Sequence, residues 1–263
     1  MSDWNPEQYL KFENDRNKPI IDLLNHIELK SPKRIIDIGC GPGNSTGFLA
    51  RQWPQAEVIG LDSSAAMLEV AKRNFPELKW VQHDATNDIS HLGKFDLVLS
   101  NAAMHWMQNH DHIVPGFFNL LNPGGVLAVQ IPHNYDSPLD QALQAISNSE
   151  KWRDQLSANS PVKYYPAGYY YDILSNLTAD FEIWITRYHH ILNFHEDIIE
   201  WYQGTGFRPY LNQLDEKGKV EFLTDILVQV KQLYTPQVDG KIIFDFKRLF
   251  FMAYMRFDNN CIY

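Results

Sequence analysis

Three glycines at alternate positions are the first residues in this sequence whose spacing suggests chemistry. Gly39, Gly41 and Gly43 follow the apolar run Ile35–Ile38, and a helical pattern begins near Asn44. Glycine permits left-handed backbone and leaves room for a ligand against the main chain. Amides at a helix start also favour an anionic group. The segment therefore predicts a ligand-binding turn between a buried strand and a helix. A glycine-rich turn without a ligand is the alternative.

Two aspartates at the ends of the next strands narrow the choice of ligand. Asp62 ends the second predicted strand, where a carboxylate can accept hydrogen bonds from ribose hydroxyls. Asp84 ends the third, where it can accept from an adenine amino group. Together with the glycine turn they predict an adenosine site. The residues expected to contact this ligand are Asp37, Gly39, Gly41, Asn44, Asp62, Ser63, Asp84, Ala85, Asn101 and Ala102.

The glycine spacing separates two kinds of adenosine ligand. The dinucleotide fingerprint needs glycine at its first, third and sixth positions. Counted from Gly39, the fifth position is Gly43 and the sixth is Asn44. This form resembles that of the class I methyltransferases, and Asp37 fits the acidic position of that superfamily. The resemblance implies S-adenosylmethionine as cofactor, and an NAD-dependent hydride-transfer enzyme is the weaker alternative.

Alternating strands and helices are expected to position these residues. The predicted strands are Arg34–Ile38, Glu57–Leu61, Leu78–Gln82, Phe95–Ser100 and Gly125–Ile131, with helices near 44–53, 64–74 and 111–121. Ser63 and Ser64 are expected at the start of the second helix, and a turn at 122–125 is expected after the third. Runs rich in Val, Ile and Leu are typical of parallel strands buried on both faces.

The second half is expected to complete the sheet and to cover its carboxyl edge, where ligands of open α/β sheets bind. Helices are predicted at 137–157, 169–177, 195–203 and 215–234, and strands at Phe181–His189 and Lys247–Phe257. We therefore expect a Rossmann-like α/β fold with seven strands, mostly parallel, and an antiparallel last strand. One domain is expected over 1–263, with an N-terminal lid at about 1–28 and helical cap segments at about 133–178 and 190–240.

Composition excludes several classes of protein. The 263 residues are 44% hydrophobic, which provides a core and excludes a disordered or fibrous chain. A net charge of −9 argues against nucleic-acid binding, and two cysteines make no disulfide framework. Without an apolar run long enough for a signal peptide or a membrane helix, a soluble cytoplasmic protein is expected. The oligomeric state is left open.

Several longer stretches resemble the trans-aconitate 2-methyltransferase family over nearly the whole chain. The more specific ones are the opening with Trp4-Asn5-Pro6, Tyr9 and Arg16, and the segment Gly204–Leu211. The resemblance implies that a methyl group passes from S-adenosylmethionine to one carboxylate of trans-aconitate, giving a monomethyl ester. Two departures from the family's pattern are Phe207, where we expect leucine, and His133, where we expect an acidic residue.

A substrate with three carboxylates needs anchors for the two that do not react. Arg208 is the first candidate, because it lies in the family-specific segment and guanidinium binds carboxylate in bidentate fashion. Its alternative role is a surface ion pair with Glu200 or Asp215. Further candidates are His133, Tyr169, Tyr170, His189, His190 and, as an aromatic face near a sulfonium, Trp106. For the aromatic candidates the alternative is core packing.

The N-terminal segment is expected to fold over the cofactor through Tyr9 and Arg16. Arg16 can pair with the cofactor's carboxylate, or with Glu13 in its own helix. No general base is expected, because a carboxylic acid with a pKa near 4 is already ionised at neutral pH. No metal site is expected, since the histidines lack metal-ligand spacing. The remaining alternatives are a carboxyl methyltransferase for another small acid, kept open by His133, and a cofactor-binding protein without turnover.

Overall fold

The computed structural model describes residues 13–156, 164–203 and 205–256. Its helices are α2 (Glu13–His26), α3 (Asn44–Gln52), α4 (Ala65–Asn74), α5 (His110–Phe118), α6 (Pro138–Ser147), α7 (Ala167–Ser175), α8 (His195–Gln203), α9 (Arg208–Leu211) and α10 (Glu216–Leu233), with short 3-10 turns η1 (Ser90–Leu92) and η2 (Met104–Trp106). Its strands are β1 (Arg34–Ile38), β2 (Glu57–Asp62), β3 (Lys79–Gln82), β4 (Phe95–Asn101), β5 (Leu121–Pro132), β6 (Phe181–Leu192) and β7 (Ile242–Tyr254).

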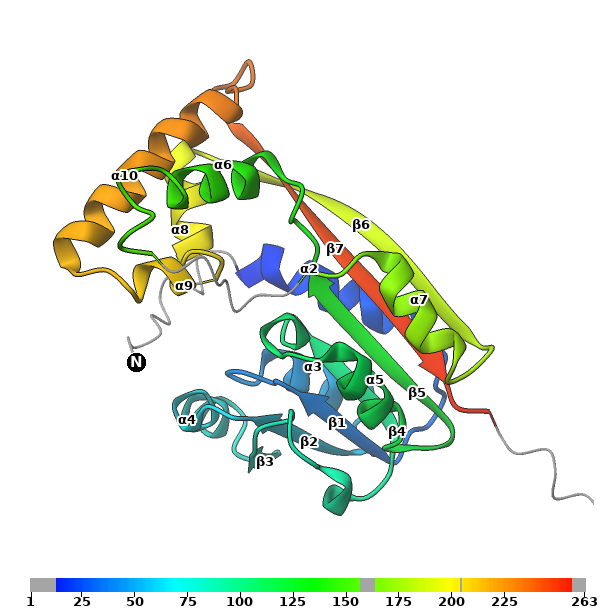
Figure 1. The fold of residues 1–263 in the computed structure, drawn as a ribbon. Coiled ribbons are helices and arrows are strands. Elements are labelled where there is room, and N and C mark those ends of the chain that lie inside the picture. The colour runs from blue at the N-terminus through cyan, green and yellow to red at the C-terminus, as the bar shows by residue number, and fades with distance from the viewer. Residues whose placement is uncertain (1–12, 157–163, 204, 257–263) are drawn as a thin grey trace, which may run out of the picture. The chain divides into compact units, whose positions relative to one another are not determined.

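The strands of these described residues form one seven-stranded sheet in the order β3-β2-β1-β4-β5-β7-β6 (Figure 1). β1 pairs in parallel with β2 and β4, and β3 and β5 extend the parallel part on either side. β7 is antiparallel to β5. The expected α/β sheet, mostly parallel with an antiparallel last strand, is confirmed. Because the chain reverses its strand order after β3, the carboxyl ends of β1 and β4 lie at a topological switch point.

By its contacts the chain divides into two compact units. The sheet unit comprises Asn17–Pro132, Tyr165–Thr186 and Arg248–Tyr263. The helix unit comprises Met1–Arg16, His133–Tyr164 and Arg187–Lys247. Strands β6 and β7 pass from one unit into the other, because the unit boundaries fall within them. The interpretation as one domain with a lid and a cap stays a prediction.

The core of the sheet unit lies between strands and helices. Buried side chains of β4, β5 and β7 pack with those of α5 and α7, among them Val129, Phe117, Tyr170 and Phe251. Their apolar character explains why the central strands are continuous hydrophobic runs rather than alternating ones. The core therefore fixes the strand ends that bear the candidate site residues.

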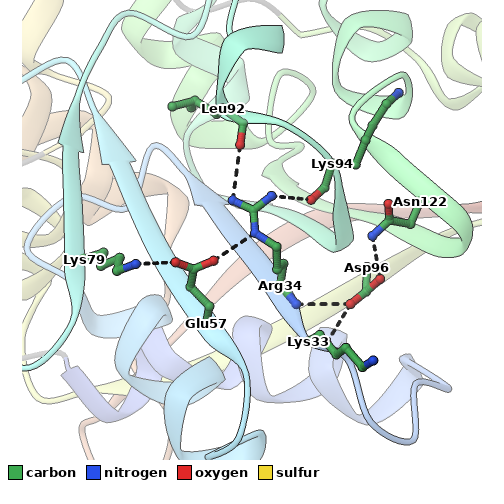
Figure 2. Close-up of polar contacts among 8 residues, drawn as sticks. All are labelled: Lys33, Arg34, Glu57, Lys79, Leu92, Lys94, Asp96 and Asn122. Carbon is green, nitrogen blue, oxygen red and sulfur yellow. Dashed lines mark hydrogen bonds and ion pairs between the residues drawn. The ribbon is translucent and has the colours of Figure 1, made fainter.

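A polar network connects the amino ends of β1, β2 and β4, opposite the candidate site (Figure 2). The Arg34 guanidinium donates to Glu57 at 2.8 Å and to two backbone carbonyls in the segment before β4. Glu57 also pairs with Lys79 of β3. Asp96 of β4 accepts from the amide of Arg34 at 3.1 Å and from the side chain of Asn122 at 2.8 Å. These bonds hold the parallel strands in register.

The helix unit has its own core, formed by α6, α8 and α10 with part of β7. Trp152, Trp201, Phe207, Phe222 and Phe244 are nearly inaccessible to solvent. The rings of Trp152 and Phe222 lie edge to face with centroids 5.2 Å apart. Buried aromatic side chains of this size contribute much of the stability of a small unit.

Three predicted boundaries were wrong. The helix predicted at 137–157 ends at Ser147, because Asn148 caps it and donates its side chain to the carbonyl of Gln144. The turn predicted at 122–125 lies within β5, which begins at Leu121, because the amide of Gly124 donates to the carbonyl of Met255. The strand predicted from Lys247 already begins at Ile242, in an alternating segment.

Candidate functional site

The turn between β1 and α3 is shaped by three left-handed glycines. Gly39, Gly41 and Gly43 have φ values of +74°, +55° and +92°. A Cβ on Gly39 would lie 2.2 Å from the Cβ of Ala103, whereas a Cβ on Gly41 would meet nothing within 4 Å. Glycine is thus needed for close packing at the first position, and at the second it leaves an open backbone face that a ligand can approach.

Asp62 connects the end of β2 with this turn. Its Oδ2 accepts a hydrogen bond from the Gly41 amide at 2.9 Å, and its Oδ1 accepts one from the Ser64 amide at 2.8 Å. Ser63 lies between the two, and Ser64 caps α4 by accepting from the amide of Met67. The structure therefore brings the predicted aspartate into direct contact with the glycine turn. Each carboxylate oxygen has a second lone pair that can accept from a ribose hydroxyl.

Asp37 lies beneath the turn and not on its open face. It is fully buried, and its Oδ2 accepts hydrogen bonds from the hydroxyls of Ser45 at 2.6 Å and Thr46 at 2.7 Å. Burial raises the pKa of Asp37 from 3.8 to about 6, although the two hydroxyl bonds lower it. Asp37 thus bonds β1 to the start of α3, which begins at Asn44. Above its pKa it also provides a negative charge behind the loop.

A second oriented carboxylate, Asp84, follows the end of β3 by two residues. Oδ1 of Asp84 accepts from the amide of Thr86 at 3.0 Å and from its hydroxyl at 2.8 Å. Both bonds lower the pKa of Asp84 below its ordinary value, and the bond from the Thr86 amide has the larger effect. Ala85, the next residue, is buried in the core of the sheet unit. Asp84 is therefore ionised at neutral pH and held in one orientation.

The end of β4 shows backbone strain beside an unpartnered polar atom. Ala102 has φ +52°, a left-handed conformation that costs an alanine about 1–2 kcal/mol. Its amide donates to the carbonyl of Gln130 at 2.8 Å. The preceding Asn101 has a buried Oδ1 with no hydrogen-bond partner among the described residues. Strain and unpartnered polar atoms of this kind concentrate at functional sites.

The aromatic candidates of the sheet unit differ in exposure. Trp106, in η2, is 38% exposed, and its ring centroid lies 5.0 Å from that of His105. Tyr169 is half-buried and stacks on Tyr165 at 4.1 Å. Tyr170 is fully buried, and its hydroxyl is already hydrogen-bonded to Nδ1 of His110 at 2.8 Å. Tyr170 therefore packs in the core, while Trp106 and Tyr169 keep accessible surface.

The remaining acceptor candidates belong to the helix unit. Arg208 is half-buried at the first residue of α9, and its guanidinium has no ion-pair partner among the described residues. The alternative ion pair with Glu200 or Asp215 is absent there, and Asp215 instead caps α10. Residues 205–207, directly before α9, form turns rather than a helix.

Three histidines proposed for the acceptor lie in different surroundings within the helix unit. His133 is 5% exposed and edge-on to Tyr135, and burial lowers its pKa. His190 is 1% exposed, with its ring centroid 4.5 Å from that of Trp201. His189, by contrast, is exposed and pairs with Asp245. His133 is therefore neutral at physiological pH, and His190 lies in an aromatic cluster.

The N-terminal candidates are only partly within the described residues. Tyr9 lies outside them. Arg16 donates to the backbone carbonyl of Trp201 at 3.3 Å, and its guanidinium carbon lies 5.2 Å from the centroid of that ring. Asp15, beside it, has its carboxylate 3.4 Å from Nδ1 of His190. These contacts place Asp15 and Arg16 against β6 and α8 of the helix unit.

Sequence reasoning missed three buried polar residues in the sheet unit: His105, Gln130 and Arg248. They are 5%, 1% and 7% exposed. Nδ1 of His105 and both amide atoms of Gln130 have no hydrogen-bond partner among the described residues. A glutamine within the predicted apolar strand Gly125–Ile131 was the available signal, since a polar side chain in a strand buried on both faces requires a partner.

Other chemistries find little support in the described part of the chain. It holds no group of three or more His, Cys, Asp or Glu side chains that could bind a metal ion. Cys40 is 4% exposed, and burial raises the pKa of its thiol far above the ordinary value, so it is not a thiolate nucleophile. None of the described helices has the length and apolar character to cross a membrane.

Comparison with known proteins places this geometry among methyltransferases. Residues 35–125 match a family model described as a methyltransferase domain. A trans-aconitate 2-methyltransferase of Rhodopseudomonas palustris (strain BisB18) is 41% identical over 255 residues, which cover 96% of this chain and 99% of the relative. One of Yersinia pseudotuberculosis is 37% identical over 256 residues, covering 97% and 99%.

Solved structures share the fold at low sequence identity. A putative methyltransferase of Bacillus halodurans is similar with a TM-score of 0.60 at 16% identity, covering 90% of this chain and 99% of the other. Phosphoethanolamine N-methyltransferase 2 of Haemonchus contortus, in complex with S-adenosyl-L-methionine, gives a TM-score of 0.54 at 16% identity, covering 91% and 52%. At these identities the similarity concerns the fold alone.

Proposed function

Since the chain belongs to the trans-aconitate 2-methyltransferase family, we propose that it transfers a methyl group from S-adenosylmethionine to one carboxylate of trans-aconitate. The product is the monomethyl ester, together with S-adenosylhomocysteine. Within the structure, the main support is the contact between Asp62 and the Gly41 amide, beside a backbone face that a Cβ would fill. A small carboxylate acceptor, no nucleic-acid partner and a cytoplasmic location belong to the same proposal.

The residues at the carboxyl ends of β1, β2 and β4 fit the cofactor. The open face of Gly41 allows close approach, and the fixed carboxylate of Asp62 accepts from ribose hydroxyls. Asp84, oriented by Thr86, accepts from the adenine amino group. The unpartnered Oδ1 of Asn101 accepts from the methionyl ammonium or an ordered water.

The ionised Asp37 behind the glycine turn favours a cation on the turn's open side. S-adenosylmethionine supplies a sulfonium methyl: the acceptor oxygen forms the C–O bond as the C–S bond breaks, and the electron pair stays on sulfur. Because the acceptor oxygen is already anionic, no side chain needs to remove a proton. The chain's contribution is alignment, which provides roughly 7–11 kcal/mol for a near-attack pose, and exclusion of water.

Holding the acceptor requires cations and donors. Arg208 is available, since its guanidinium has no ion-pair partner among the described residues. Trp106 keeps more than a third of its surface exposed and can offer its ring face to a sulfonium. His133 and Tyr169 are further polar candidates, with the neutral His133 able to donate one N–H.

Transfer of labelled methyl groups tests the proposal. The purified protein is incubated with methyl-labelled S-adenosylmethionine and a panel of small acids, and base-labile esters are identified by mass. Trans-aconitate monomethyl ester as the main product supports the proposal. Preferential labelling of another acid assigns a different acceptor. The neutral His133, which stands where the family's pattern predicts an acidic residue, would accommodate such an acceptor. Cofactor binding without ester formation from any acid contradicts enzymatic function.

A further inference from the structure

Three polar side chains share one face of the sheet at the carboxyl end of β5. Asn101 of β4 is paired with Gln130 of β5, and Pro132 of β5 is paired with Arg248 of β7. Residues paired across strands point to the same face, and so do residues two apart on one strand. Asn101, Gln130 and Arg248 therefore lie on one face of three neighbouring strands, in a row that runs diagonally because Phe250 is the residue directly opposite Gln130 on β7. All three belong to the sheet unit.

The glutamine in this row is buried without a partner. Gln130 is 1% exposed, and neither its Nε2 nor its Oε1 has a hydrogen-bond partner among the described residues. Leaving a buried donor or acceptor unsatisfied costs about 1–3 kcal/mol. A leucine would fill the same volume without this penalty, so the amide points to a ligand that forms the missing bonds.

A buried cation lies diagonally across β5 and β7 from this glutamine, and an imidazole lies close enough to feel its charge. Arg248 is 7% exposed. The burial of His105 lowers the pKa of its imidazole to about 3, and the charge of Arg248 is the second cause of this shift. His105 is therefore neutral, and its buried Nδ1 has no hydrogen-bond partner among the described residues. The guanidinium, the amide NH₂ and an imidazole N–H are all donors that suit a carboxylate.

The same face has opposite charges at its two ends. Asp37 of β1 is paired with Leu99, which lies two residues before Asn101 on β4, so Asp37 belongs to the same row. Asp37 and Arg248 are three strands apart at about 4.8 Å each, and the register places them four residues apart along the strands at about 3.3 Å each, so they are separated by roughly 20 Å. A cationic methyl donor above the acidic end and an anionic methyl acceptor above the basic end match this distribution of charge.

We propose that Arg248, Gln130 and His105 form a subsite for one acceptor carboxylate that does not react. The inference rests on the proposed function and assigns residues to its acceptor. Arg248 binds two carboxylate oxygens in bidentate fashion, and Gln130 donates its amide hydrogen to one of them. Fixing this carboxylate determines which of the remaining ones faces the methyl group.

Binding of trans-aconitate in the presence of S-adenosylhomocysteine, measured by calorimetry, tests the subsite directly. Arg248→Gln should weaken trans-aconitate binding about 30- to 5,000-fold, the loss typical when one partner of a buried charged pair is truncated. Arg248→Lys keeps the positive charge but not the bidentate geometry of the guanidinium, and its affinity for trans-aconitate should fall about tenfold. Gln130→Leu should also lose about tenfold. Affinity for S-adenosylhomocysteine should stay within about twofold of wild type in all three.

Matched controls separate the subsite from general effects. Arg73 is an exposed arginine on α4, and Arg73→Gln should bind trans-aconitate like wild type. Retained S-adenosylhomocysteine affinity and circular dichroism report that each variant folds. If Arg248→Gln does not fold, the Lys and Leu variants decide the question.

Removing carboxylates from the acid identifies the group that Arg248 contacts. Itaconate, mesaconate and trans-glutaconate each lack one of the three carboxylates of trans-aconitate. For wild type, one of them should bind much more weakly than the other two. In Arg248→Gln this difference should shrink to within about threefold, because the carboxylate and its partner form one pair in a thermodynamic cycle.

Three results would overturn the inference. One is unchanged trans-aconitate affinity in Arg248→Gln while wild type forms the ester, which refutes the subsite and leaves the proposed function intact. Another is a loss of S-adenosylhomocysteine binding instead, which assigns Arg248 to the donor's carboxylate. The third is a wild-type protein that neither binds nor methylates any of these acids, which refutes both proposals together.

Discussion

Replacing Asp37 with asparagine should change the pH dependence of stability in a defined direction. The folded state holds a proton on Asp37 more tightly than the unfolded chain, because burial raises its pKa from 3.8 to about 6. The carboxyl therefore contributes stability that is fully present below about pH 4 and is lost as the pH rises through about 6. Asparagine does not ionise, and its carbonyl can still accept from Ser45 and Thr46.

The size of the effect follows from the two pKa values. A tenfold change in proton affinity is worth about 1.4 kcal/mol, so ionising Asp37 in the folded protein costs roughly 3 kcal/mol. About 1.4 kcal/mol of this falls between pH 5 and pH 8. Relative to wild type, Asp37→Asn should therefore gain about 1.4 kcal/mol of unfolding free energy between these pH values. Any loss of unfolding free energy from burying the amide NH₂ of asparagine is the same at pH 5 and pH 8, so it cancels in this comparison.

Urea denaturation at pH 5 and pH 8 measures this difference. Asp88→Asn is the control, because hydrogen bonds from Ser90 lower the pKa of the exposed Asp88. Its carboxylate contributes stability that is lost only on acidification below its unfolded pKa of about 4, so the difference between this variant and wild type should be nearly the same at pH 5 and pH 8. A stability difference between Asp37→Asn and wild type that does not vary with pH would refute the reasoning.

The same variant should show what the buried charge does for the ligand. S-adenosylmethionine has a sulfonium charge that S-adenosylhomocysteine lacks. Removing an attraction of about 1 kcal/mol should lower the ratio of their affinities about fivefold in Asp37→Asn. Calorimetry with both ligands gives this ratio, and an unchanged ratio would remove the electrostatic role assigned to Asp37.

Four more substitutions separate the parts of the site. Gly41→Ala should cost about 1–2 kcal/mol of stability, from left-handed strain alone, but should abolish measurable S-adenosylhomocysteine binding. Gly39→Ala should destabilise the protein more, because its Cβ would lie 2.2 Å from the Cβ of Ala103. Equal denaturation midpoints for the two variants would contradict this difference. Asp62→Ala should weaken S-adenosylhomocysteine about tenfold or more, and calorimetry showing wild-type affinity would exclude it from the ribose site. Arg208→Ala should raise the KM for trans-aconitate about tenfold or more with unchanged cofactor affinity, as steady-state kinetics can establish.

The sheet and the cofactor turn were predictable because their signals are local. Apolar runs such as Arg34–Ile38 identify buried strands, and the glycines after them identify the turn. Asp62 was placed at the site by strand order alone, and the structure shows it bonded to Gly41. In each case, the residues that determine the structure are neighbours in sequence or lie at the ends of adjacent strands.

The missed features depend on contacts between distant parts of the chain. Gly124 reads as a turn residue, but its bond to Met255 extends β5. The spacing of Trp152 continues a helical pattern beyond Ser147, although its burial results from packing on Phe222. Arg248 resembles any charged residue in an exposed strand until the register with β5 places it in a buried row.

A crystal structure of the protein with S-adenosylhomocysteine tests the central claim most directly. We predict that the ligand's ribose hydroxyls bond to Asp62, that its adenine lies beside Asp84 and Ala85, and that its homocysteine follows the open backbone of Gly41 toward Asn101. A ligand bound elsewhere, with the turn from Gly39 to Gly43 making no contact to it, would contradict the account.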